Sequence, residues 1–257
     1  MSEREDKVNN KAIFITVRSA STRLPTKALI EIDGMKTIEY VIRQAKKSKL
    51  ADLIVLCTTL QQEDDALCEI AKKNGIKCFR GSVTDKLERW RGAAKSYDVD
   101  FFVTADGDDL FCSAELIDLA FEQQLRNKSE FIESDEVVCG SFTYGISVNA
   151  LTKACEIKQT DDTEMMWVYF TNTDICTVEK LENVPTLYKR KDVRMTLDYK
   201  EDLEFFSNVI KHFDRKDFTT RDVLKYLDKN ESIKDINFFL EETWRENQIN
   251  KTNLVIK

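Results

Sequence analysis

Short apolar runs that alternate with helix-like patterns constrain the fold of this chain more than any other sequence feature. Four mostly apolar segments lie in the first half, at residues 12–17, 53–57, 76–79 and 100–105, and the first of them is continuous and rich in β-branched and aromatic residues. Runs of this length and composition are typical of buried strands. Helical patterns follow them from about residue 36, over 64–73, from 82 and over 114–125. This alternation predicts βαβ units, an α/β fold and a mostly parallel central sheet.

The helical segments carry start and stop signals of their own. Ser82 and Asp85 have the spacing of a capping box, so a helix is expected to begin there. Gly75 is placed to end the helix over 64–73. Ligands of parallel sheets bind where strands end, so the polar loops 18–27, 80–89 and 106–109 are the expected binding region.

After about residue 136 the pattern changes. Strands are predicted at 137–142, 175–178 and 193–197, and helices at 149–157, 164–170, 199–212 and after a cap at Thr219. No Gly/Ser-rich linker separates the two halves. We therefore expect a disordered tail over 1–10 and one domain over 11–257, whose second half, about 131–257, forms an inserted subregion beside the first, about 11–130.

Composition excludes several classes of protein. The formal net charge of −7 argues against a broad nucleic-acid surface. No stretch reaches the length of a membrane span, and the charged first ten residues lack a signal-peptide pattern. Seven scattered cysteines without a C-x-x-C pair, with one histidine, indicate reduced thiols and no zinc site. A cytoplasmic protein is expected.

The loop over residues 18–27 (RSASTRLPTK) suits phosphate binding. It places three cations and four hydroxyls in ten residues directly after a buried strand. Cationic side chains, hydroxyls and backbone amides together can surround a triphosphate. A solvated loop is the alternative, since cationic loops are common and the Walker pattern is absent.

Two acidic segments are candidate metal ligands. Asp106, Asp108 and Asp109 follow the strand over 100–105, where neighbouring carboxylates need a cation or hydrogen bonds to offset their repulsion. Oxygen ligands of this kind suit Mg²⁺, although Asp and Gly are also ordinary turn residues. Asp198 ends a later predicted strand, and Asp202 is better explained as a helix-terminal residue. A cationic loop that faces two carboxylates is what metal-assisted nucleotidyl transfer needs.

These segments occur in an order that resembles a known family. The chain is similar to the CMP-Kdo synthetase and spore-coat polysaccharide cytidylyltransferase-like families from about residue 12 to 237. The motifs that carry the resemblance are Arg18-x-x-Ser-Thr-Arg-Leu-Pro-x-Lys27-x-Leu29, Phe79-Arg-Gly-Ser82 with Asp85, Leu87 and Arg89, Gly107-Asp108, Leu116-Ile-Asp118, Thr196-Leu-Asp198 with Glu201-Asp202-Leu203-Glu204, and Ile236-Asn237.

The resemblance implies a Rossmann-like nucleotide-diphospho-sugar transferase fold and a CTP-dependent cytidylyltransferase. Residues 11–130 would bind CTP and 131–257 the acceptor, an acidic sugar whose hydroxyl attacks the α-phosphate and releases pyrophosphate. Mg²⁺ would be held by Asp108 and Asp198, and the expected catalytic residues are these two with Arg18 and Lys27. The expected nucleotide-binding residues are Arg18, Ser21, Thr22, Arg23, Lys27, Thr58, Arg80, Gly81, Ser82, Asp85, Arg89 and Asp106. The expected acceptor-binding residues are Tyr144, Glu164 and Arg194.

The chain departs from the family pattern mainly on the acceptor side. Thr26 stands where a glycine is usual, and Leu110 and Ser113 replace a proline and an aspartate. Tyr144-Gly145 and Glu164-Met-Met166 replace a usual P-G and E-H-V. Two alternatives therefore stay open, a cytidylyltransferase for a non-sugar or phosphorylated acceptor and a non-catalytic nucleotide-binding relative. The expected partners are CTP and a small acceptor, without nucleic acid or membrane, and a homodimer is left open.

Overall fold

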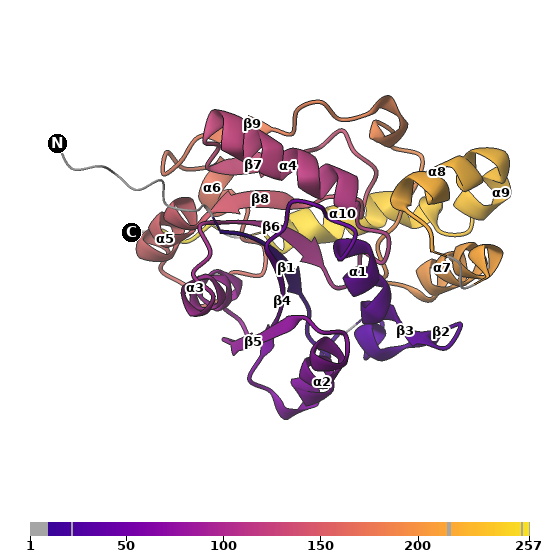
Figure 1. Ribbon diagram of the computed structural model, residues 1–257, viewed down its shortest axis with the longest axis horizontal. Coiled ribbons are helices and arrows are strands. Elements are labelled where there is room, and N and C mark those ends of the chain that lie inside the picture. The colour runs from indigo at the N-terminus through magenta and orange to yellow at the C-terminus, as the bar shows by residue number, and fades with distance from the viewer. Residues whose placement is uncertain (1–9, 22, 215–216, 253, 257) are drawn as a thin grey trace.

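A seven-stranded, mostly parallel sheet forms the centre of the molecule (Figure 1). The computed structural model describes residues 10–21, 23–214, 217–252 and 254–256. The strand order is β5-β4-β1-β6-β8-β7-β9, and within this sheet β8 alone runs against the others. The strands are β1 (Lys11–Thr16), β4 (Leu53–Thr59), β5 (Lys77–Gly81), β6 (Phe101–Asp106), β7 (Phe131–Glu133), β8 (Tyr144–Ser147) and β9 (Val178–Lys180), and β2 (Glu31–Ile32) pairs with β3 (Met35–Lys36) in a separate ribbon. The predicted α/β fold with a mostly parallel sheet is confirmed.

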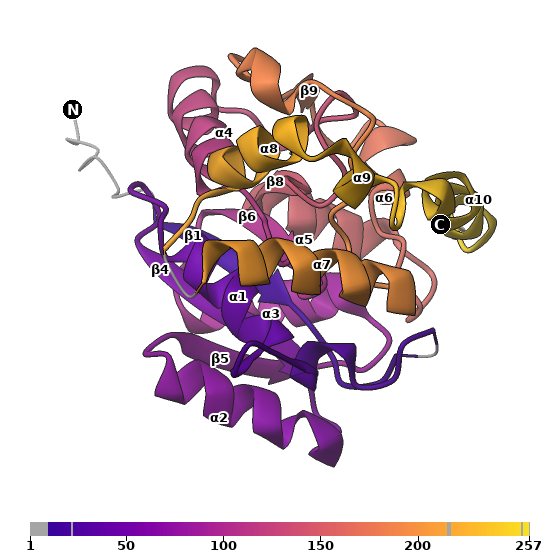
Figure 2. The same ribbon diagram turned by 90° about the vertical axis from the view of Figure 1, so that its right-hand side faces the viewer.

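Helices cover both faces of the sheet, as Figures 1 and 2 show. Successive residues of β1 point to opposite faces and join two separate apolar clusters, Ile13 and Ile15 one and Ala12 and Phe14 the other. The first cluster also holds residues of α1, α2, α4, α7 and α8, and the second those of α3, α5 and α6. The helices are α1 (Thr37–Ala45), α2 (Asp65–Lys73), α3 (Lys86–Ser96), α4 (Ala114–Asn127), α5 (Val148–Ile157), α6 (Val168–Thr171), α7 (Lys200–Phe213), α8 (Thr220–Lys229), α9 (Glu231–Lys234) and α10 (Glu241–Asn250).

The elements predicted for the first half lie within a few residues of those observed. The main correction concerns α3, which begins at Lys86, because Asp85 is its N-cap and accepts a hydrogen bond from the amide of Glu88. Ser82 instead accepts from the amide of Asp85 and closes the turn before the helix. The expected tail falls mostly on residues 1–9, which lie outside the described part of the chain.

In the second half the strand predictions at 137–142 and 193–197 are wrong. The two segments meet at a single bridge, Cys139 to Arg194, and the sheet is completed instead by β7 and β8 on either side of the first segment. Val138, Met195 and Leu197 are fully buried. The apolar residues of these segments therefore reflect burial in the core, which does not require the backbone to pair as a strand. Two predictions were displaced along the chain, since 175–178 becomes β9 and 164–170 becomes the shorter α6.

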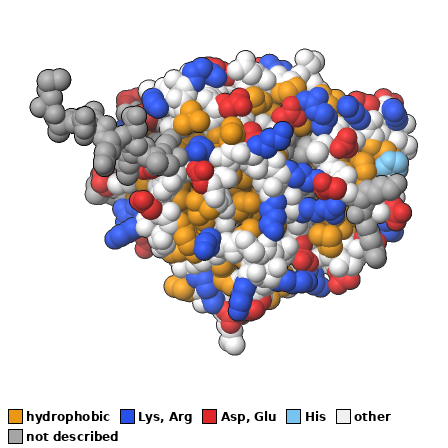
Figure 3. Space-filling view, viewed as in Figure 1, with side chains coloured by type: hydrophobic (Ala, Val, Ile, Leu, Met, Phe, Trp, Pro, Cys, Tyr) orange, Lys and Arg blue, Asp and Glu red, His pale blue; other side chains and the backbone are white. Residues whose placement is uncertain are grey.

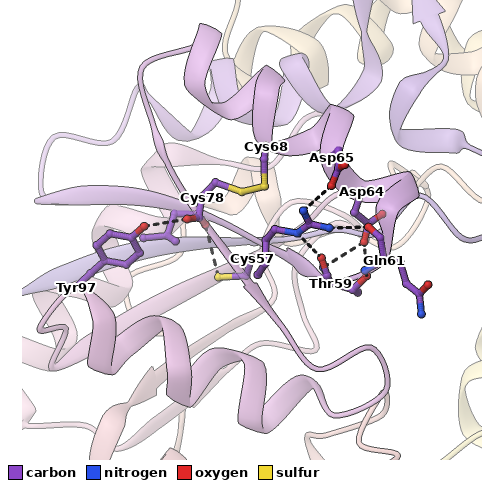
Figure 4. The surroundings of a disulfide bond; sticks show 10 residues. Cys57, Thr59, Gln61, Asp64, Asp65, Cys68, Cys78 and Tyr97 are labelled. Atoms are coloured by element: carbon purple, nitrogen blue, oxygen red, sulfur yellow. Dashed lines mark hydrogen bonds and ion pairs between the residues drawn. A yellow bond between two sulfur atoms is a disulfide. The ribbon is translucent and has the colours of Figure 1, made fainter.

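The expectation of seven reduced thiols is wrong for one pair. The structure joins Cys68 of α2 to Cys78 of β5 (Figure 4). The packing of α2 against β5 brings their Cα atoms to 5.6 Å, within the range a disulfide spans. The two cysteines thus meet through tertiary packing, which their spacing in the sequence could not show.

The charged side chains on the face drawn in Figure 3 are of both signs and interspersed. Among the described residues, no helix has the length and apolar character needed to cross a membrane.

Candidate active site

A cleft with a volume of about 720 Å³ opens where β1 and β6 end. It is lined by residues of the loop after β1, of the loop after β6, and of several segments from the second half of the chain. The predicted residues that line it are Arg18, Ser21, Arg23, Lys27, Arg89, Asp106, Asp108, Tyr144, Glu164 and Asp198. Loops that are far apart in sequence therefore meet at one edge of the sheet, as parallel topology requires.

Gly107 allows the loops after β1 and β6 to approach closely. Its amide donates to the carbonyl of Thr16 at 2.9 Å, and a Cβ at this position would lie 2.5 Å from the Cβ of Val17. No side chain fits in that space. The glycine therefore sets the aspartates after β6 directly beside the cationic loop after β1.

The centre of the cleft is an ion cluster around Lys27. The ammonium lies 2.5 Å from Asp108 Oδ2 and 2.7 Å from Asp198 Oδ1. Lys27 opens a short 3-10 helix, Lys27–Leu29, and its carbonyl accepts a hydrogen bond from the hydroxyl of Thr37. The amide of Leu197 donates to the carbonyl of Asp108 at 2.9 Å, which fixes the two aspartate segments side by side. Two carboxylates from distant parts of the chain thus converge on one cation.

Every oxygen of the Asp198 carboxylate has a donor. Arg23 lies 2.8 Å from Oδ1, which it shares with Lys27, and the indole N–H of Trp244 donates to Oδ2 at 2.6 Å. Burial raises the pKa of this carboxyl, but the charges of Lys27 and Arg23 outweigh burial and lower the pKa to about 2. Asp198 is therefore ionised at neutral pH and can hold a cation.

The carboxyls next to Asp108 behave differently. Burial raises the pKa of Asp109 well above its usual range, and the neighbouring charges of Asp108 and Asp106 add to that effect. The pKa of Asp106 is also raised, by burial first, although Lys86 opposes the shift. A cation close to the turn after β6 would offset the repulsion among these carboxyls and favour their charged forms.

Glu164 and Tyr144, which were expected to bind the acceptor, face the same cleft. Glu164 pairs with Arg18 at 3.2 Å. Burial raises the pKa of Glu164, but Lys86 and Arg18 lower it on balance, so the side chain is anionic. Burial also raises the pKa of Tyr144, which keeps its hydroxyl protonated and able to donate.

Several predicted site residues do not line this cleft. Arg80 is turned toward the loop before α2, where it bonds to Asp65 and to the carbonyls of Thr59 and Gln61. Arg194 is fully buried and pairs with Asp202 at 2.9 Å, so the structure places it behind the cleft wall and not among the residues open to an acceptor. Thr58, Gly81, Ser82 and Asp85 are also absent from the lining, and Thr22 lies outside the described residues.

A smaller hollow of about 390 Å³ adjoins the cleft across residues 18–21. Thr59, Asp64 and Val83 line it, together with Ser19 and Ser21 of the loop after β1. Arg80 and Ser82 do not line this hollow themselves, but residues next to them do: Val83 follows Ser82, and Gln61 accepts a hydrogen bond from Arg80.

The structure adds cleft residues that the sequence did not indicate. Trp244, Arg245, Gln248 and Lys251 come from α10 and the residue after it. The only local signal was an isolated tryptophan in a polar segment, which is too weak to indicate a site.

Comparison with known proteins bears directly on this geometry. The sequence model of a family described as cytidylyltransferase matches residues 12–243. The chain belongs to the cytidylyltransferase family. The match spans the loop after β1, the turn after β6 and Asp198, so it includes the whole ion cluster.

Individual members of the cytidylyltransferase family resemble the chain to different extents. An uncharacterized protein of Methanocaldococcus jannaschii is 33% identical over 87% of this chain and 93% of its own length. The spore coat polysaccharide biosynthesis protein SpsF of Bacillus subtilis is 24% identical over 87% of this chain and 96% of its own length. A 3-deoxy-manno-octulosonate cytidylyltransferase of Chloroherpeton thalassium is 33% identical over 45% of this chain and 46% of its own length.

A solved structure agrees with the fold. A cytidylyltransferase from Leptospira borgpetersenii superposes with a TM-score of 0.79 at 29% identity, over 87% of this chain and 96% of that one. The family and the fold together establish the protein as a nucleotidyltransferase of the cytidylyltransferase type.

Proposed function

We propose that the protein transfers CMP from CTP to an acidic sugar of the ulosonic-acid type, with release of pyrophosphate, for surface glycan biosynthesis. A relative named for 3-deoxy-manno-octulosonate supports the acceptor class, and SpsF supports the glycan context. The observation that carries the proposal is the convergence of Asp108 and Asp198 on the ammonium of Lys27.

The ion cluster fits a magnesium site. Both carboxylates are presented to one cationic atom, and carboxylate oxygens are the ligands that Mg²⁺ prefers. The described residues contain no group of three or more acidic, His or Cys side chains that could hold a metal without help. Magnesium usually binds one or two carboxylates and takes its other ligands from substrate phosphates and water. Asp108 and Asp198 are the residues that would hold it, where it would offset charge on the phosphoryl oxygens.

The remaining residues position the reactants. Arg18, Arg23 and Lys27 would surround the triphosphate, whose negative charge is complementary to the positive charge of these side chains. The sugar hydroxyl oxygen attacks the α-phosphorus and releases its proton to solvent, the bond to the bridging oxygen breaks, and pyrophosphate leaves with both electrons of that bond. Catalysis of this kind depends on placement and electrostatics and needs no covalent enzyme intermediate.

Turnover of purified protein tests the proposal. CTP, Mg²⁺ and 3-deoxy-manno-octulosonate should yield pyrophosphate and a CMP-sugar, measured by a coupled phosphate assay and mass spectrometry. Asp108→Asn keeps the turn but removes the charge, so turnover should fall by about 100-fold or more. CTP affinity from calorimetry should change far less. Glu122→Gln, on the exposed surface of α4, is the matched control and should keep full turnover.

The outcomes separate the alternatives. Pyrophosphate release only with a non-sugar or phosphorylated acceptor would replace the acidic sugar but keep the reaction. Binding of CTP without release of pyrophosphate for any acceptor would favour a non-catalytic nucleotide-binding protein. Equal turnover by Asp108→Asn and the unaltered protein would contradict the assigned site.

A further inference from the structure

The last part of the chain crosses the cleft as a strap. We define this C-terminal strap as residues 241–252 and 254–256, which comprise α10 and the described residues after it. None of the residues of α10 is buried, although the helix lies against the cleft. Figure 2 shows α10 at the right-hand edge of the molecule, with the end of the chain beside it. The helix therefore does not belong to the apolar core that holds the other long helices in place.

Each end of the strap is fixed to a different segment of the second half of the chain. At its start, Glu241 pairs with Arg194 at 3.2 Å, and the ring of Trp244 lies 5.1 Å from the guanidinium of Arg194. At its end, the carbonyl of Val255 accepts from the amide of Gln159 at 2.9 Å, and Ile256 forms a bridge with Lys158. The strap thus spans from the Asp198 segment to the residues that follow α5.

One face of α10 is turned to the cleft. The strap residues that line the cleft are Glu241, Trp244, Arg245, Gln248 and Lys251, and they recur along the chain at intervals close to one helical turn. Side chains at these intervals share one side of a helix. Ile249, on another side of the same helix, is 69% exposed. Helical periodicity therefore separates a cleft face from a solvent face in an element without buried residues.

The strap also reaches the reactive centre. Trp244 Nε1 donates to Asp198 Oδ2, while Lys27 and Arg23 share the other oxygen of that carboxylate. An indole has one donor and no acceptor, so this bond fixes the orientation of the carboxylate. The match to the family model ends at residue 243, one residue before Trp244. This contact is thus made by a part of the chain beyond that match.

We infer that the C-terminal strap is the acceptor-side wall of the cleft and that Trp244 is a positioning residue, which orients Asp198 through the indole N–H. The inference rests on the proposed function and assigns a place for the acceptor. Lys251 stands on the cleft face, and within the described residues it has no ion-pair partner. Lys251 and Glu164 line the same cleft, and a cationic side chain there can meet an anionic group of the acceptor.

Trp244→Phe in the full chain tests the positioning role. Phenylalanine keeps an aromatic ring beside Arg194 but removes the donor to Asp198. The loss of a hydrogen bond to a charged group lowers a rate or equilibrium constant by a factor of roughly ten or more. We therefore expect kcat to fall about tenfold, while the KM for CTP stays within about twofold of that of the unaltered protein. Ile249→Ala, on the solvent face of the same helix, is the matched control and should change neither constant.

Lys251→Gln tests the acceptor wall. The probe is 3-deoxy-manno-octulosonate. The KM for this acceptor should rise about tenfold because a charge-assisted contact is lost, while the KM for CTP stays the same. An unchanged acceptor KM, or an equal rise in both constants, would show that the strap does not face the acceptor.

A second measurement does not depend on turnover. In ¹⁵N-labelled protein, the indole N–H signal that disappears in Trp244→Phe should shift in Asp198→Asn, and again when CTP and Mg²⁺ are added to the unaltered chain. A signal that responds to neither would overturn the positioning role. If the unaltered protein releases no pyrophosphate with any acceptor, the proposed function fails, and this signal still decides whether the strap reaches the site.

Discussion

Arg194 shows how a single residue can support a site without facing it. Its side chain is fully buried, pairs with Asp202 and Glu241, and packs beside Trp244. Asp202 in turn accepts from the amides of Asp198 and Tyr199 at 2.8 and 2.9 Å. The buried pair therefore holds the backbone at Asp198 in place, which is a different role from the acceptor contact that the sequence suggested.

Removal of one partner of this pair should be strongly destabilising. Asp202→Asn leaves Arg194 buried with less compensating charge, so the free energy of unfolding should fall by about 3–5 kcal/mol in urea titrations. Glu182→Gln removes the partner of Arg126 in a pair whose side chains are about half exposed, and it should cost less than about 1 kcal/mol. Similar losses in the two variants would contradict a structural role for Asp202.

Among the elements, those of the first half were predictable because the spacing of their apolar residues follows the repeat of the strand or helix that forms. The runs over 12–17 and 100–105 are buried on both faces as parallel strands, and the helices between them have distinct apolar stripes. The second half has buried segments without a strand ladder, such as the one around Met195. Burial leaves an apolar pattern whichever way the backbone is bonded, so the pattern could not separate the two cases.

The contact between residues 139–140 and the Met195 segment gives a prediction at this scale. Gly140 has a φ of +80°, and a Cβ there would lie 2.0 Å from the carbonyl oxygen of Met195. Gly140→Ala should lower the free energy of unfolding by about 3 kcal/mol or more, through left-handed strain and overpacking together.

Gly75→Ala provides the control for that variant. Gly75 has a φ of +67°, but a Cβ added there would meet no other atom within 4 Å, so only conformational strain remains. Its loss should be about 1–2 kcal/mol in the same urea titration. Equal losses at Gly75 and Gly140 would show that the close approach to Met195 has no energetic effect.

At the scale of the whole molecule, binding in the cleft should stabilise the fold. A ligand at about 100 times its Kd adds about 2.7 kcal/mol to the stability of the state that binds it. For a chain of 257 residues this corresponds to a rise in Tm of roughly 5–10 °C. CTP should produce that rise in differential scanning fluorimetry and GTP should not, and an equal effect of the two would contradict specificity for cytidine.

The site was predictable as a whole only where the family resemblance reached it. The loop after β1 and the aspartates at 108 and 198 carry recognisable motifs, and the structure gathers them at one edge of the sheet. Arg80 and Thr58 could not be placed from sequence, because which way a side chain points at a strand end depends on its neighbours. Trp244 could not be found at all, since it lies in no recognisable motif and its contact to Asp198 forms only in the folded chain.

The reversed strand β8 has a consequence for redesign of this enzyme. It meets β6 over only three residue pairs, whereas β1 and β6 pair over six. Within the sheet, β8, β7 and β9 are joined to the parallel block along this one short antiparallel border. A graft exchanged at that border would leave the block that carries Lys27 and Asp108 intact. Swapping residues 131–180, from β7 to β9, among relatives is therefore the natural route to a chimera in which the proposed acceptor side is exchanged.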